Sequence, residues 1–129
     1  MAEHKNQYET IFIATPVLSE EDFKQTVKGY TDFLKSNNAE IINEERWGLR
    51  QLAYPIDDKT TGIYYLIEFK AEPQLIDQLE LNFRRDTNIM RFLTSYLDKY
   101  GIEYNEKRRK GEIGRKNKNQ ETEEQQEAE

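Results

Sequence analysis

Arginine side chains next to aromatic ones are the residues of this 129-residue chain whose types and spacing favour a chemical task. Arg46 and Arg50 flank Trp47, and Arg84 and Arg91 occur close together further along the chain. A guanidinium group can contact a phosphate through two N–H groups at once and can stack on a nucleobase. These arginines are therefore candidates for nucleic-acid contacts, although neighbouring carboxylates could equally pair with them as ordinary surface residues.

Aromatic residues on or beside the expected strands form a second set of candidates, namely Tyr8, Trp47, Tyr54, Tyr64 and Tyr65. About half of them should be simple core residues. Those that project to an uncovered face could stack on bases or pack against a protein. Because successive side chains of a strand point to opposite faces, Tyr64 and Tyr65 are expected on different sides of the sheet.

The charge of the chain changes abruptly near its C-terminus. Residues 1–106 carry 12 Lys and Arg against 19 Asp and Glu, a net of −7; residues 107–118 carry +6 and residues 119–129 carry −5. The net charge of −6 by itself argues against nucleic-acid binding, which depends on cations. The basic block, led by Lys107, Arg108 and Arg109, is nevertheless a second candidate for phosphate contacts, with a solubilising tail as the alternative.

Residues for catalysis or metal binding are not found in a suitable pattern. The chain has one histidine, His4, and no cysteine. The acidic run at residues 20–22 is explained by the start of a helix, and Asp57 and Asp58 by a turn. No glycine-rich phosphate loop occurs. The sequence therefore predicts no enzyme, no cofactor, no metal site and no small-molecule substrate.

Six elements are expected to position the candidate residues. Apolar and β-branched runs predict strands at residues 8–16, 39–50, 61–71 and 88–97. Ser19 is expected to cap a first helix ending near residues 36–38, and Pro73 to begin a second helix. The order strand, helix, strand, strand, helix, strand predicts an α+β, ferredoxin-like βαββαβ fold: a four-stranded antiparallel sheet with two helices on one face.

The chain is expected to form one domain with two appendages: an N-terminal extension at residues 1–7, the domain at residues 8–105, and a disordered, charged C-terminal tail at residues 106–129. The tail is expected to be disordered because it has too few apolar residues to offset the entropy of ordering. No apolar run reaches the roughly 18 to 20 residues of a membrane-spanning helix, and no export signal is visible, so a cytoplasmic protein without membrane contact is predicted.

The segment WGLRQLAYPI at residues 47–56 closely resembles the signature of the bacterial small-subunit ribosomal protein six family. Supporting similarities run from about residue 8 to residue 98, including the pair Tyr8 and Glu9. The resemblance implies a ferredoxin-like fold and a ribosomal location. It also implies joint binding, as a heterodimer with small-subunit ribosomal protein eighteen, to the central domain of small-subunit ribosomal RNA. A basic partner would supply cations that this acidic chain lacks.

The resemblance places Arg50 to Ile56 in the family's hairpin segment near its RNA and protein partners, and Arg84 and Arg91 among its arginines near RNA. From composition and resemblance together, RNA contacts are expected at Tyr8, Arg46, Arg50, Arg84, Arg91, Lys107, Arg108 and Arg109, and partner contacts at Trp47, Leu52 and Tyr54. The three basic residues of the tail are expected to contact phosphate because of their charge alone. The chain departs from the family pattern in three places: Asn6 stands where a basic residue is usual, Asp57 lowers the positive charge of the hairpin tip, and the tail is of a variable kind.

Three alternative functions remain open. An RNA-recognition motif shares the strand order, but Thr61–Glu68 does not match its signature on the third strand. A small-molecule sensor or acyl-phosphate hydrolase would need a phosphate-binding loop after the first strand, where Thr15–Leu18 has no glycine or arginine. A protein-interaction module without RNA contact would be favoured if the arginines were held in intramolecular salt bridges.

Overall fold

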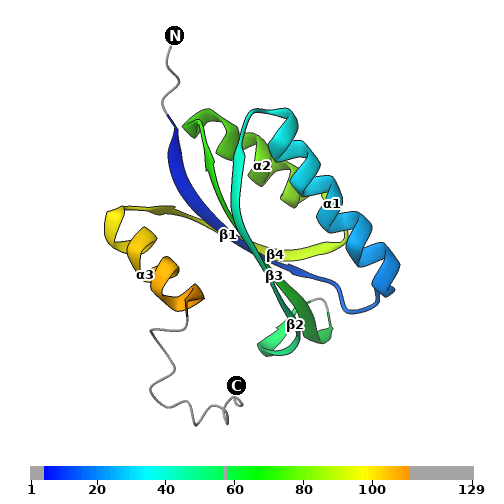
Figure 1. The fold of residues 1–129 in the computed structure, drawn as a ribbon. Helices are drawn as coiled ribbons and strands as arrows, with labels where there is room; N and C mark the ends of the chain where they lie inside the picture. The colour runs from blue at the N-terminus through cyan, green and yellow to red at the C-terminus, as the bar shows by residue number, and fades with distance from the viewer. Residues whose placement is uncertain (1–4, 57, 111–129) are drawn as a thin grey trace. The chain divides into compact units, whose positions relative to one another are not determined.

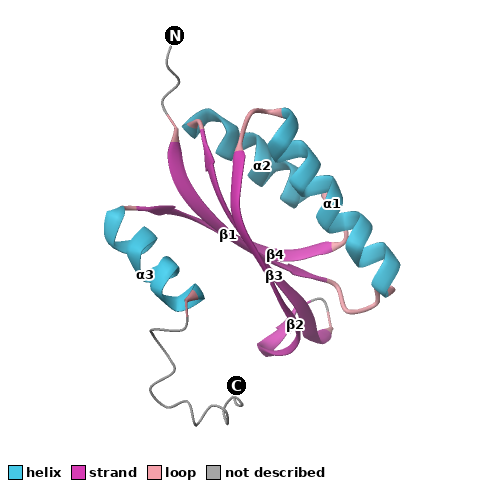
Figure 2. Ribbon diagram, viewed as in Figure 1, coloured by secondary structure: helices cyan, strands magenta, loops and turns pink. Residues whose placement is uncertain are grey.

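The computed structural model describes residues 5–56 and 58–110. The elements formed by these residues are β1 (Asn6–Ala14), α1 (Glu20–Ser36), β2 (Glu40–Ile56), β3 (Lys59–Ala71), α2 (Pro73–Arg85), β4 (Ile89–Leu97) and α3 (Lys99–Arg109) (Figures 1 and 2). The described part of the chain divides into two compact units, one within residues 5–96 and the other within residues 97–110. The sheet with α1 and α2 makes up the first unit, and α3 belongs to the second.

The four strands form one antiparallel sheet in the order β2-β3-β1-β4. β3 pairs with β1 on one side and with β2 on the other. Each of the helices α1 and α2 joins two strands that have a third strand between them, and both lie over the same face of the sheet (Figure 2). The predicted ferredoxin-like βαββαβ architecture is confirmed.

Local signals explain where α1 and α2 begin. The Ser19 hydroxyl accepts a hydrogen bond from the Asp22 backbone N–H at 3.0 Å, and three acidic residues occupy the first turn of α1, at the positive end of the helix dipole. α2 begins with Pro73, whose fixed φ angle and missing N–H suit the first helical turn. Each helix turns one apolar stripe towards the sheet.

The core lies between these two helices and one face of the sheet. Its largest members are fully buried side chains, including Phe12, Leu34, Phe69, Leu79 and Phe83. The Phe12 and Phe83 rings lie 5.3 Å apart, joining the central strand β1 to α2. Burial of such large side chains, at about 1.5 to 3 kcal/mol each, is the main force that holds the helices on the sheet.

Alternation along the strands defines the other side of the sheet, which we call the second face. Phe12 is paired with Tyr65, and both lie on the helix-covered side. Their neighbours Ile13 and Tyr64, which are also paired, must therefore point to the second face. The predicted separation of Tyr64 from Tyr65 is confirmed.

The β2–β3 hairpin extends beyond the rest of the sheet. The pairing of β1 with β3 ends at Ala14 and Ile63, whereas β2 and β3 stay paired as far as Ile56 and Lys59. The sequence predicted a loop from residue 51, but the strand continues through Pro55. Proline is tolerated there because β2 is an edge strand. Asp57, at the tip, lies outside the described residues.

Regular secondary structure extends into both of the predicted appendages. β1 begins at Asn6, inside the segment expected to be an extension. α3, which the sequence did not predict, runs to Arg109, so the tail expected from residue 106 begins within a helix. A local cap favours the start of α3, because the Asp98 side chain accepts a hydrogen bond from the Gly101 backbone N–H at 2.8 Å. Residues 1–4 and 111–129 lie outside the described part of the chain.

Candidate nucleic-acid interface

Arg46 is held in an intramolecular ion pair. Both of its terminal nitrogens donate hydrogen bonds to the Glu20 carboxylate, with Nη2 at 2.8 Å from Oε1. Its guanidinium group also lies 4.7 Å from the centre of the Phe23 ring. The hydrogen bond from Arg46 lowers the pKa of Glu20 below its ordinary value. This arginine therefore ties β2 to the start of α1, and two of its five N–H donors are used within the chain.

Trp47 and Arg50 form a different arrangement on the second face. The Trp47 indole stacks on the Tyr64 ring with centroids 6.3 Å apart and an interplanar angle of 15°. The Arg50 guanidinium lies 5.3 Å from the Trp47 ring, and Trp47 Nε1 donates to Glu45 Oε1 at 2.9 Å. Gly48, with φ of 86°, allows the bulge that brings Trp47 over Tyr64.

The hairpin presents one buried and one exposed candidate. Leu52 is buried, whereas 64% of Tyr54 is exposed. Gly62 permits the close approach of the strands here, because a Cβ atom at this position would lie 2.3 Å from Ile13 Cγ2 and 3.7 Å from Leu52 Cδ2. The exposed ring of Tyr54 is thus carried on a hairpin whose base is tightly packed.

Arg91 lies on the same face as Arg50. Phe92 stacks on Phe83 of α2, and Thr94 hydrogen-bonds Thr10 on the helix-covered side. The alternate position Arg91 must therefore point to the second face, where it is exposed. Arg50 on β2 and Arg91 on β4 thus flank the second face from its two edges.

Arg84 and Tyr8 lie elsewhere. Arg84 is on α2, with Nη2 3.8 Å from Glu80 Oε1 and its guanidinium 5.6 Å from the Phe92 ring. Tyr8 is buried, with its ring 5.8 Å from that of Phe69 and 6.0 Å from that of Tyr96, and is therefore placed as a core residue. Its hydroxyl accepts a hydrogen bond from the Asn6 side chain.

The remaining basic candidates occupy the last turn of α3. They are Lys107, Arg108 and Arg109. Lys107 Nζ lies 3.5 Å from Glu103 Oε2, one helical turn earlier. Because α3 belongs to the second unit, these residues form a candidate site of their own.

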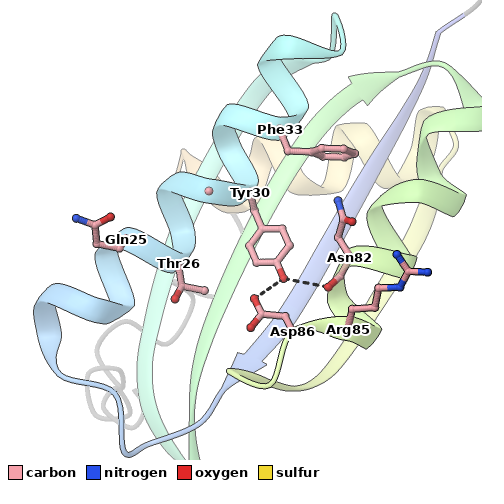
Figure 3. Close-up of a pocket in the computed structure, with 8 residues that line it drawn as sticks. Gln25, Thr26, Tyr30, Phe33, Asn82, Arg85 and Asp86 are labelled. Atoms are coloured by element: carbon pink, nitrogen blue, oxygen red, sulfur yellow. Dashed lines mark hydrogen bonds between the residues drawn. The ribbon is translucent and has the colours of Figure 1, made fainter.

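A pocket of about 360 Å³ between α1 and α2 could suggest a catalytic site, but its Tyr30 and Asp86 side chains are used by the fold (Figure 3). The Tyr30 hydroxyl donates to Asp86 Oδ2 at 2.7 Å, and Asp86 Oδ1 accepts the Asn88 backbone N–H at 2.8 Å. Burial, and next the hydrogen bond to Asp86, raises the pKa of Tyr30 well above its ordinary range. The pair therefore stabilises the contact between the two helices.

Residues 5–56 and 58–110 contain no cluster of three or more His, Cys, Asp or Glu residues able to hold a metal ion. No helix among them is both long and apolar enough to cross a membrane.

Comparison with known proteins agrees with the sequence signature. A sequence model of the family described as Ribosomal protein S6 matches residues 7–95. The small ribosomal subunit protein bS6 of Parabacteroides distasonis is 62% identical over 104 residues, which cover 81% of this chain and 88% of that relative. The corresponding protein of Porphyromonas gingivalis is 56% identical over 104 residues, covering 81% and 89%. The chain belongs to the ribosomal protein S6 family.

A solved structure shares the S6 fold. The crystal structure of 30S ribosomal protein S6 from Thermotoga maritima superposes with a TM-score of 0.71 at 28% identity, covering 84% of this chain and 98% of that one. As an S6 family member, the chain is a structural component of the small ribosomal subunit and not an enzyme. The resemblance noted at residues 47–56 is thereby confirmed.

Sequence reasoning found Trp47 and Arg50 but missed what surrounds them. The stack of Trp47 on Tyr64 depends on the bulge at Gly48, which shifts the register of β2 by one residue. The ion pair of Arg46 joins residues 26 positions apart. Its only signal in the sequence was the acidic run at the start of α1, which helix capping already explained.

Proposed function

We propose that this chain binds the central domain of small-subunit ribosomal RNA together with small-subunit ribosomal protein eighteen, as a heterodimer. The observation that carries the proposal is the pair of exposed arginines on the second face. Arg50 and Arg91 make no ion pair within the described residues, unlike Arg46. Such guanidinium groups are suited to phosphate contact.

The role of the partner follows from charge. Residues 1–106 carry a net charge of −7, so long-range electrostatics oppose the approach of RNA to the domain alone. A basic partner on or beside the second face would reverse this field locally and add phosphate contacts of its own. Trp47, Leu52 and Tyr54 are proposed to contact that partner, with Tyr54 as the most exposed of the three.

The arrangement argues against the RNA-recognition-motif alternative. That motif reads single-stranded RNA with two or three aromatic rings on its central strands. Here the second face of the central strands β1 and β3 carries Ile11, Ile13, Tyr64 and Leu66, a single aromatic among them. The pure protein-interaction module is disfavoured because only some of the arginines are held in ion pairs.

A titration tests the proposal. The central-domain RNA is mixed with this protein, with ribosomal protein eighteen, and with both, at two salt concentrations. Tight, salt-sensitive binding that is far stronger with both proteins than with either one alone is the expected result. Equal binding by this protein alone would contradict the heterodimer, and no binding in any mixture would favour an interaction module without RNA contact.

Two matched variants test whether Arg50 on the second face contacts the RNA. Arg50→Gln is expected to weaken joint binding and to reduce the slope of log affinity against log salt by about 1. Lys35→Gln removes one exposed charge from α1, on the other side of the sheet, and should leave both quantities unchanged. Equal effects of the two variants would show that net charge, and not a contact at the second face, governs binding.

A further inference from the structure

α3 has a composition that helix stability alone does not explain. The Asp98 cap and the basic last turn favour a helix at this position. The helix has almost no apolar stripe, yet it carries Tyr100 and Tyr104 with 69% and 51% of their surface exposed. Large exposed rings are favoured at binding surfaces because they offer contact area at a small cost in conformational entropy.

The two tyrosines and two charged residues share one side of the helix. Residues four apart lie on the same face, about 6 Å apart along the axis. Tyr100, Glu103, Tyr104 and Lys107 accordingly line a shallow hollow of about 190 Å³. Lys107 is paired with Glu103 at 3.5 Å, so its ammonium group is held at the rim of this hollow.

Positive charge accompanies the rings. Residues 99–110 contain five Lys and Arg against two Asp and Glu, a net of +3 in a chain whose total is −6. Lys99 Nζ lies 5.3 Å from the Tyr100 ring centre, and the cations of the last turn begin at Lys107, three residues after Tyr104. The helix therefore offers aromatic faces inside a positive field, although the sheet domain is acidic.

We propose that the face of α3 formed by Tyr100, Tyr104 and Lys107 binds single-stranded RNA. Bases stack on the tyrosine rings, while Lys107 and the basic last turn contact the backbone phosphates. Tyr100 and Tyr104 are separated by an axial rise of about 6 Å. Two rings that hold one base between them lie ~6.8 Å apart, taking roughly 3.4 Å per stacking step, so the two distances are similar. The inference goes beyond the heterodimer, because it requires neither the partner protein nor the central-domain RNA.

Other occupants fit this face less well. A helix that docks in a protein groove presents aliphatic anchors at successive turns, but Ile102 is the only aliphatic residue in α3. A membrane-surface helix needs a broad apolar face, which is also absent from α3. RNA fits this face better, because its phosphates can pair with the cations and its bases can stack on the tyrosine rings.

Binding is measured with the full chain, without partner, by fluorescence anisotropy of a labelled, mixed-sequence RNA of about 12 nucleotides, within the usual range of single-strand sites. The same RNA annealed to its complement serves as the duplex probe. We expect salt-sensitive binding that favours the single strand. Absence of binding at low salt, or preference for the duplex, would overturn the proposal.

The variants Tyr100→Ala and Tyr104→Ala are each expected to weaken single-strand binding about fivefold or more, whereas Phe at both positions should preserve it because the ring remains. Alanine has the highest helix propensity, so these changes do not melt α3, which circular dichroism would verify. Tyr96→Ala, at a similarly exposed tyrosine of β4, is the matched control and should have no effect.

Two further outcomes would also overturn the proposal. If Lys107→Gln weakens binding and the alanine variants do not, the contact is purely electrostatic. If the alanine variants leave RNA affinity unchanged but weaken association with ribosomal protein eighteen, α3 is a protein-docking helix. The double variant Tyr100→Ala/Tyr104→Ala separates the two proposals. In the titration of the central-domain RNA with both proteins, this variant should still bind jointly with ribosomal protein eighteen, because the heterodimer should still assemble.

Discussion

Gly62 provides a direct test of how the hairpin is packed against the sheet. A Cβ atom at this position would lie 2.3 Å from Ile13 Cγ2, whereas carbon atoms in contact are about 3.5 to 4.0 Å apart. Cγ2 is bonded directly to the Cβ atom of a β-branched residue, whose χ1 angle is stiff in a strand. Gly62→Ala therefore requires a shift of more than about 1 Å in the side chain or strand of β1.

The size of the effect can be worked out from two terms. Overpacking of a well-packed site costs about 1 to 3 kcal/mol. Replacing glycine also lowers the conformational entropy of the unfolded chain, which stabilises the folded state by about 0.4 to 1 kcal/mol. The difference between these terms runs from about 0 to 2.6 kcal/mol. Because the clash is with the stiff Ile13 side chain, we expect the upper part of this range: Gly62→Ala should lower the free energy of unfolding by about 1 to 2.6 kcal/mol, and the melting temperature by about 5 to 20 °C for a domain of this size.

The assay is urea unfolding followed by the fluorescence of Trp47, the one tryptophan of the chain. Gly29→Ala on α1 is the matched control, because a Cβ atom there would meet nothing within 4 Å. It should raise the free energy of unfolding by about 0.5 to 1 kcal/mol, since alanine favours helix over glycine. The two Gly→Ala changes are thus expected to shift the free energy of unfolding in opposite directions.

A double-mutant cycle identifies the contact. Ile13→Ala removes Cγ2, so Gly62→Ala introduced into that variant should cost little or nothing, giving a coupling energy of about 1 kcal/mol or more. A neutral Gly62→Ala, or the same loss of stability with and without Ile13 Cγ2, would falsify the reasoning. The first result would mean that the strands give way easily, and the second that the strain lies elsewhere.

Three further predictions concern other contacts. Because the pKa of Glu20 is lowered from its ordinary value of 4.5, the ion pair with Arg46 stabilises the protein at pH values above 4.5, and this stabilisation is lost as the pH falls below 4.5. Arg46→Gln should therefore make the free energy of unfolding less dependent on pH in that acidic range. Tyr30→Phe leaves an oxygen of Asp86 without its donor and should cost about 1 to 3 kcal/mol in urea unfolding. Because the pKa of Tyr30 is raised above 10.0, the wild type should lose stability above pH 10 and the Phe variant should lose less. Asp98→Ala removes the cap of α3 and should speed amide hydrogen exchange in its first turn, with that of β1 unchanged as the internal reference.

The architecture could be predicted because each element carries its own local signal. Ser19 marks the start of α1, and Pro73 that of α2. The alternation of Tyr64 and Tyr65 assigned each to its face of the sheet. These signals depend on neighbours in the sequence, so no knowledge of distant contacts was needed to read them.

The candidate interface was predictable in composition but not in arrangement. Arg46 and Arg50 looked equivalent in the sequence, yet one is bound to Glu20 and the other lies over Trp47. The difference arises from the bulge at Gly48, because a shift of one residue sends a side chain to the other face. α3 was missed although Asp98 and the i, i+4 tyrosines were visible, since the composition of the following residues suggested disorder.

The hairpin also bears on how the protein avoids sticking to itself. β2 is an edge strand of 17 residues, long enough to recruit a strand from another molecule and begin aggregation. Pro55 removes one backbone donor from this edge, and the register shifts between Arg46 and Gly48 and between Gln51 and Ile56 interrupt its straight course. The regular edge is thereby divided into short lengths. A chain that must remain available for assembly thus carries its protection against self-association in the same strand that presents Trp47 and Arg50.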